Sequence, residues 1–209
     1  MLVTVLNWNC VEKSNSKNGD KAEINKDSIS EYDDSDLTVY DKKWVNYVDE
    51  KGVKQSEMEL YISKYGDTLS WSKRIFKNGV LDSTQSTFYN FEAKRAKDSV
   101  IKGRITMFSS LDYSVKEPII QRKLTVDFIN YYLDKKKVIS FESKNQNYVD
   151  FEFKNNDDEI VGLLTEERQI NLQTSPDSIQ FIWSKLPIDN QSPTDNPFIH
   201  VHELNKNKR

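Results

Sequence analysis

Apolar and polar residues alternate with a period of two along most of this 209-residue chain, from Leu37 onward. Successive side chains of a β-strand point to opposite faces, so this alternation is typical of half-buried antiparallel strands. The pattern therefore predicts an all-β fold in which each strand buries one face. The apolar members of the four clearest runs are Met58, Leu60 and Ile62; Ile101, Ile105 and Met107; Leu124, Val126 and Phe128; and Val149, Phe151 and Phe153.

Short turn signals separate these runs. Asn78-Gly79 is the strongest of them, because both residues accept the positive φ that a two-residue hairpin needs. Segment 124–133 also fits a helical face, but its Thr, Val, Ile and Tyr content favours a strand. About ten strands without intervening helices predict an antiparallel up-and-down meander that forms a barrel or a sandwich. The further strands are expected at Thr38–Val48, Thr68–Phe76, Ser86–Glu92, Lys137–Glu142, Ile160–Glu166, Ser178–Leu186 and Phe198–Leu204.

The sequence lacks the motifs of the common enzyme classes. It contains no G-x-G-x-x-G or G-x-x-x-x-G-K-[ST] loop for phosphates and no G-x-S-x-G nucleophile elbow. Its single cysteine excludes an internal disulfide framework and a multi-cysteine metal site. We therefore predict no cofactor and assign no catalytic residue, and a non-enzymatic protein is favoured.

Charge is distributed unevenly along the chain. Residues 12–36 carry eight acidic and four basic side chains, whereas the chain as a whole has a net charge of -3, so residues 37–209 are close to neutral. A neutral body lacks the basic field that attracts nucleic acid or an anionic membrane. The expected partner is an unknown protein or small ligand, with no nucleic acid.

The N-terminal segment has an apolar stretch, Met1–Leu6, followed by Cys10 and then a polar stretch up to residue 36. This order resembles the end of a bacterial lipoprotein signal, which implies a lipid on Cys10 and a flexible tether behind it. The apolar stretch is short, which a start codon placed too far downstream would explain. The alternative is an ordinary first strand and an ordinary thiol.

The resemblance sets the expected domains and location. Residues 1–36 are predicted to be a truncated signal and a disordered acidic tether, 37–204 a single β domain, and 205–209 a basic tail. The resemblance implies a lipid-anchored protein of the periplasm or outer membrane, touching the membrane only through that anchor. If Met1 is the true start, the protein is cytoplasmic.

Three groups of side chains are candidates for binding. His200 and His202 leave the same face of a predicted strand and could form a two-ligand metal pair, whereas the simpler interpretation is a last strand with two solvated histidines. Five aromatic residues could line a cavity or a carbohydrate platform, and the alternative is a β-sheet core that uses aromatics. Asp189 and Asp195 lie in an irregular loop of the kind that carries recognition. The aromatic candidates are Trp44, Trp71, Tyr89, Tyr131 and Trp183.

Three functional hypotheses follow. The first is a non-enzymatic envelope domain that binds a small ligand or a protein. The second is a carbohydrate-active hydrolase on a β-sandwich, using two carboxylates. The third is a cytoplasmic inhibitor or immunity-type partner protein. Glu166, Glu167 and Arg168 are expected to form a charged strand end with a surface ion pair of little energetic weight.

Overall fold

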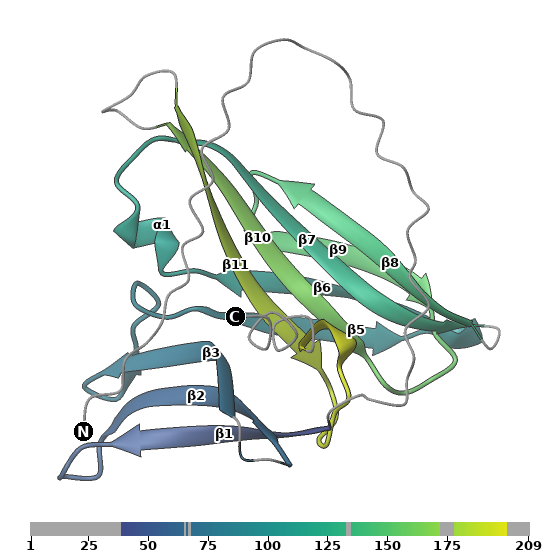
Figure 1. Ribbon diagram of the computed structural model, residues 1–209, viewed down its shortest axis with the longest axis horizontal. Helices are drawn as coiled ribbons and strands as arrows, with labels where there is room; N and C mark the ends of the chain where they lie inside the picture. Colours follow the sequence, from purple (N-terminus) through teal and green to yellow (C-terminus); the bar gives the residue numbers. More distant parts are fainter. Residues whose placement is uncertain (1–38, 65, 67, 133–134, 172–177, 200–209) are drawn as a thin grey trace, which may run out of the picture.

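The computed structural model describes residues 39–64, 66, 68–132, 135–171 and 178–199 (Figure 1). Within these ranges the protein is all-β, with eleven antiparallel strands in three sheets. The predicted fold class is thereby confirmed. The predicted tether at residues 1–36, Cys10 within it and the basic tail lie outside the described residues. No helix of the described part of the chain is long and apolar enough to cross a membrane.

The N-terminal sheet has the order β1-β2-β3-β4 and lies at the lower left of Figure 1. The turn between β3 and β4 is the predicted Asn78-Gly79 hairpin, with φ of 53° at Asn78 and 77° at Gly79. Such φ values suit Asn and Gly, because neither residue is strongly penalised in the left-handed region. The strands are β1 (Tyr40–Val48), β2 (Lys54–Ser63), β3 (Thr68–Lys77) and β4 (Val80–Leu81).

The other two sheets form the larger part of the molecule. The three-stranded sheet has the order β5-β6-β9, and the long sheet has the order β11-β10-β7-β8. Segment 124–133, which fitted both strand and helix, lies largely in β7 and is a strand. The remaining elements are β5 (Phe88–Arg95), η2 (Lys97–Ser99), β6 (Val100–Phe108), α1 (Leu111–Ser114), β7 (Ile119–Tyr132), β8 (Lys135–Lys144), β9 (Tyr148–Lys154), β10 (Val161–Asn171) and β11 (Ile179–Asp189).

Strand order follows chain order only in the N-terminal sheet. After β8 the chain crosses to the three-stranded sheet, where β9 pairs with β6, and it then returns so that β10 pairs with β7. No barrel closes among the described strands, so of the two predicted arrangements packed sheets are the one observed. Alternation in the sequence tells which face of a strand is buried, but it does not tell which strand is the neighbour.

The main core lies between the long sheet and the three-stranded sheet. In Figure 1, β5 and β6 cross beneath the diagonal strands β7, β10 and β11, and the buried side chains of both sheets form one cluster. Phenylalanines fill its centre, with ring centroids 4.9 Å apart for Phe128 and Phe151 and 5.0 Å for Phe128 and Phe153. These are typical separations for aromatic packing in a core. The alternation that predicted these strands therefore also identified this core.

The C-terminal end of the described chain differs from the prediction. A strand was expected at Phe198–Leu204, but residues 197–199 form a helical turn, and 200–204 lie outside the described residues. Ile199 is fully buried against Tyr40 and Tyr61 of the N-terminal sheet. The apolar residue that looked like part of an alternating strand thus closes a small second core instead.

Candidate functional site

A broad groove of about 450 Å³ lies between the N-terminal sheet and strands β5 and β11. Strands β1, β2 and β3 provide one wall, and residues 89–92 and 189–190 provide the other. Its volume falls in the range of about 300–1,000 Å³ that is usual for small-molecule sites, and such sites often lie where structural units meet. The groove is therefore the first place to look for function.

The groove exists because β2 turns its polar side inward. The alternation predicted that Met58, Leu60 and Ile62 would be buried, but these residues are only half-buried. Glu59 and Tyr61, on the side expected to be exposed, are 3% and 0% exposed. That prediction was wrong for this strand, because the partners across the junction are polar groups of β11 and its following loop. A buried polar face is stable where it is hydrogen-bonded.

A bulge in β3 brings two kinds of side chain to the inner face. Leu60 pairs with Ser70 but Met58 pairs with Lys73, so β3 has one residue more than β2 across this stretch. Such a bulge locally changes which side chains face inward. As a result the partly buried Trp71 packs on both core clusters, while the next residue, Ser72, is buried and lines the groove.

Glu59 is the chemically unusual member of the groove. Its side chain is 3% exposed and its Oε2 atom has no hydrogen-bond partner. Burial raises the pKa of this carboxyl group, and the negative charge of Asp189 adds to the effect, while Lys42 and a hydrogen bond with Ser72 offset part of it. A buried carboxyl with an unused oxygen at a groove wall is a group that a ligand can complete.

Asp189 lies in the same groove but is fully partnered. Its Oδ1 accepts a hydrogen bond from Thr194 at 2.6 Å, and its Oδ2 accepts one from Tyr61 at 2.9 Å and one from Asn196 at 3.0 Å. Burial raises the pKa of this carboxyl too, and the three hydrogen bonds oppose that effect. Asp189 therefore holds the end of β11 to its surroundings.

Trp44 and two cations complete the groove. The Arg74 guanidinium lies 4.6 Å from the centre of the Trp44 ring and is itself hydrogen-bonded to Glu57 at 3.1 Å. Trp44 remains 39% exposed, so part of its surface is accessible while the cation lies against the ring. The Lys42 Nζ donates to the main-chain oxygen of Asp189. These contacts fix the aromatic ring before any ligand arrives.

The structure brings together three of the seven residues predicted to bind a ligand: Trp44, Tyr89 and Asp189. Tyr89 donates to the Pro187 main-chain oxygen at 3.1 Å, and burial raises the pKa of its hydroxyl group. Glu59 and Arg74 were missed, because a Glu or an Arg in an alternating strand looks like an ordinary solvent-facing residue. No local sequence signal distinguishes them.

The other predicted residues lie elsewhere. Trp71 belongs to the core, and Trp183 is 42% exposed on β11, where it stacks on Phe181 and donates to Glu167 at 3.0 Å. Burial raises the pKa of Glu159, and the negative charge of Asp195 adds to this effect. The side chain of Tyr131 is outside the described residues, as are His200 and His202. The described residues contain no cluster of three metal-ligating side chains.

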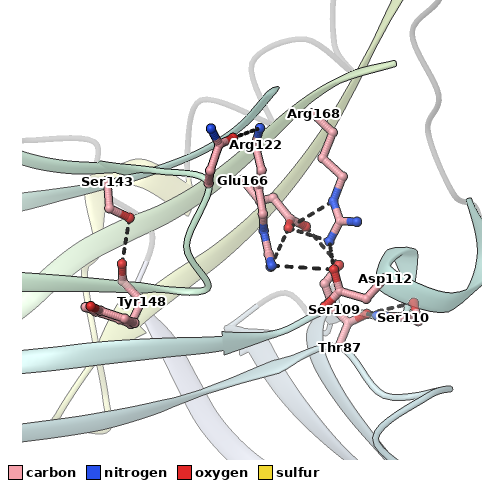
Figure 2. Close-up of polar contacts among 10 residues, drawn as sticks. Thr87, Ser109, Ser110, Asp112, Arg122, Ser143, Tyr148, Glu166 and Arg168 are labelled. Carbon is pink, nitrogen blue, oxygen red and sulfur yellow. Dashed lines mark hydrogen bonds and ion pairs between the residues drawn. The ribbon is translucent and has the colours of Figure 1, made fainter. Parts of the chain in front are cut away.

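A second constellation is a buried charge cluster between the long sheet and α1, shown in Figure 2. Glu166 and Arg168 are both fully buried, with the Arg168 Nη2 2.6 Å from the Glu166 Oε1. Arg122 of β7 reaches the same oxygen at 2.7 Å, and Ser109 donates to Oε2 at 2.8 Å. Asp112 of α1 lies 2.6 Å from Arg168. The predicted weak surface ion pair is wrong: β10 turns these charges into the sandwich.

This cluster holds α1 in place. The helix buries none of its own residues, and Asp112 joins it to the two arginines. Two positive and two negative side chains balance, which limits the cost of burying them. The Nη1 of Arg168 has no hydrogen-bond partner, but the residue is fully buried and does not line the groove. We therefore interpret the cluster as structural.

Comparison with protein-family models, with curated proteins and with solved structures finds no match for this chain.

Proposed function

We propose that this protein is a non-enzymatic binding domain that holds a small ligand in the groove between the N-terminal sheet and strands β5 and β11. The single observation that carries the proposal is Glu59, a carboxyl group 3% exposed whose Oε2 faces no partner. An unsatisfied buried polar atom costs about 1–3 kcal/mol. A ligand that hydrogen-bonds to it recovers this free energy, whereas a purely structural carboxyl would be paired as Asp189 is.

A second candidate is the hydrolase that uses two carboxylates. The raised pKa of Glu59 favours it, because a general acid on a carboxyl group works better when its pKa is raised. Its second carboxylate would be Asp189, whose oxygens accept hydrogen bonds from Tyr61, Thr194 and Asn196. A nucleophile or base needs an oxygen that is free to react, and both oxygens of Asp189 are already engaged in these hydrogen bonds, so binding without cleavage is the better supported function.

The test is titration of the full chain with a library of water-soluble fragments, followed through the indole N–H signals of its tryptophans by NMR. Trp44 in the groove and Trp183 on β11 are similarly exposed, at 39% and 42%, so Trp183 is an internal control. We expect fragments that shift the Trp44 signal alone and lose affinity in Glu59→Met, which cannot hydrogen-bond, but not in Glu167→Met. If every fragment that binds leaves the Trp44 signal unchanged, the groove is not the site.

We also propose a location in the bacterial envelope, supported by the apolar Met1–Leu6, Cys10 and the polar stretch that follows. In the native host, expressed with its upstream DNA, Cys10→Ala should move the protein from the detergent phase to the aqueous phase. Ser14→Ala is the control and should stay in the detergent phase. Equal partitioning of Cys10→Ala and the unmodified protein contradicts the lipid anchor and favours the cytoplasmic partner protein.

A further inference from the structure

Trp44 presents a fixed aromatic surface inside a polar groove. The Arg74 guanidinium lies 4.6 Å from the ring centre, and the hydrogen bond from Arg74 to Glu57 holds that cation in place. The ring is 39% exposed and lines the groove. An immobilised ring with an accessible surface loses little entropy on binding, and it suits a ligand with a flat apolar face.

The polar groups around the ring are of mixed type. Ser72 and Asn90 offer donors and acceptors, and Glu59 offers the buried Oε2 atom that has no partner. A hydroxyl group both donates and accepts, so a ligand rich in hydroxyls can satisfy every one of these side chains. A ligand that is only a donor or only an acceptor would leave part of the lining unpaired, at a cost.

The lining carries groups of both signs. Lys42 and Arg74 are basic, and Glu59, Glu92 and Asp189 are acidic. A strongly anionic ligand would meet the carboxyl groups, and a strongly cationic one would meet Lys42 and Arg74. Such a lining gives no net attraction to either sign of charge and favours a neutral ligand.

We propose that the ligand of this groove is a neutral saccharide. Its pyranose ring stacks on Trp44, and one of its hydroxyl groups hydrogen-bonds to the Oε2 atom of Glu59. The inference rests on the proposed function and adds the chemical class of the ligand. A saccharide combines the three properties that the groove selects, namely an apolar ring face, hydroxyl groups and no net charge. Glu59 and Trp44 are then the residues that determine specificity.

The experiment is NMR and calorimetric titration of the full chain with neutral trisaccharides of glucose, galactose, mannose, xylose and N-acetylglucosamine. Sialyllactose and a heparin disaccharide serve as charged probes. We expect at least one neutral trisaccharide to shift the Trp44 indole signal and not that of Trp183. The affinity should fall about tenfold or more in Glu59→Met, because an apolar side chain of similar size cannot hydrogen-bond to the ligand hydroxyl.

Matched tryptophan variants complete the test. Trp44→Ala should abolish measurable binding, whereas Trp183→Ala, which removes an equally exposed tryptophan from β11, should leave affinity unchanged. Trp44→Tyr keeps an aromatic ring and should retain weakened binding. An amide NMR spectrum of Trp44→Ala that matches wild type outside the groove shows that its loss of binding is not loss of folding. Equal affinities in Trp44→Ala and Trp183→Ala overturn the stacking that the proposal requires.

The remaining outcomes separate this inference from the proposed function. If fragments shift the Trp44 signal but no trisaccharide binds, the ligand is not a saccharide and the groove remains a binding site. Preference for the charged probes also overturns it. Absence of any Trp44 shift, from fragments or sugars, overturns both proposals. Cleavage of a bound trisaccharide, detected by mass spectrometry, supports the saccharide class and replaces the binding domain with the hydrolase.

Discussion

Glu59 and Asp189 are two buried carboxyl groups in one groove, and their partners give them different roles. Asp189 accepts three hydrogen bonds from side chains, whereas Glu59 keeps an oxygen without a partner. Burial raises the pKa of both groups. The buried Glu59 oxygen without a partner destabilises the fold, whereas hydrogen bonds compensate the burial of Asp189. Buried carboxyl groups with a raised pKa are common at functional sites.

The first prediction concerns the pH dependence of stability at Glu59. Because the pKa of Glu59 is raised on folding from 4.5, the folded protein binds more protons than the unfolded chain between that value and the raised pKa. Its contribution to stability is therefore lost as pH rises through this window. Glu59→Gln cannot ionise, so its free energy of unfolding relative to wild type should be higher at about pH 7.5 than at about pH 4.

Urea denaturation at the two pH values measures this difference, and taking the variant minus wild type cancels the other carboxyl groups. Glu142→Gln is the control with the opposite sign, because Lys123 lowers the pKa of Glu142 on folding. Its effect should be small, since the Glu142 side chain is 52% exposed. A pH-independent difference between Glu59→Gln and wild type contradicts the raised pKa.

Strand β10 shows how one element can combine core packing with charge. Its inward-facing residues are Leu164, Glu166, Arg168 and Ile170, all buried, so two charges interrupt an apolar row. Arg168 pairs across the strands with Arg122 of β7, and the resulting positive pair needs both Glu166 and Asp112. The element therefore depends on charges that lie on another strand and on α1.

The second prediction separates the two acids of this cluster. Glu166→Gln leaves two arginines buried with one counter-charge fewer, and removing one partner of a buried pair costs about 3–5 kcal/mol. Asp112→Asn should cost about 1 kcal/mol, because the Asp112 side chain is 35% exposed and water can replace it. Glu167→Gln, on the opposite face of β10, should cost less than about 1 kcal/mol. Urea denaturation measures all three, and equal losses for Glu166→Gln and Asp112→Asn contradict a buried anchor.

Alternation in the sequence predicts elements well where an apolar face meets an apolar core. Strands β7 and β9 follow it, because Phe128 and Phe153 pack on each other between two sheets. It fails at β2, where the polar side is the buried one, and at β10, where Arg168 looks like a surface residue. In both cases a polar group that compensates the burial is remote in sequence, namely Asp189 for Tyr61 and Asp112 for Arg168. Trp44 and Asp189 are also far apart in the sequence. Each was predicted to bind a ligand, but the sequence did not predict that they line one groove.

The molecule as a whole is two sheets packed face to face with a third attached through a polar junction. The N-terminal sheet is joined to the end of β11 by the hydrogen bond from Tyr61 to Asp189 and by main-chain hydrogen bonds between Tyr40 and Thr194. A small core of Tyr40, Tyr61 and Ile199 accompanies these bonds, Trp71 links it to the main core, and main-chain hydrogen bonds between Lys73 and Thr87 add a second attachment. The groove runs along this junction, so the proposed ligand would contact both parts and would stabilise their attachment.

The third prediction is that this junction opens before the rest of the molecule unfolds. Tyr61→Phe removes the hydrogen bond to Asp189, which is 2.9 Å long and buried, and should lower the free energy of opening by about 1–2 kcal/mol. Amide hydrogen exchange should then become roughly tenfold faster in β1, β2 and β3, while β6, β7 and β10 keep their protection, because local opening exposes only the N-terminal sheet. Tyr113→Phe, at a residue 59% exposed on α1, should change neither group. Equal acceleration of exchange in all three sheets would mean that the molecule opens as one cooperative unit. A ligand in the groove would then stabilise the whole fold and not the junction in particular.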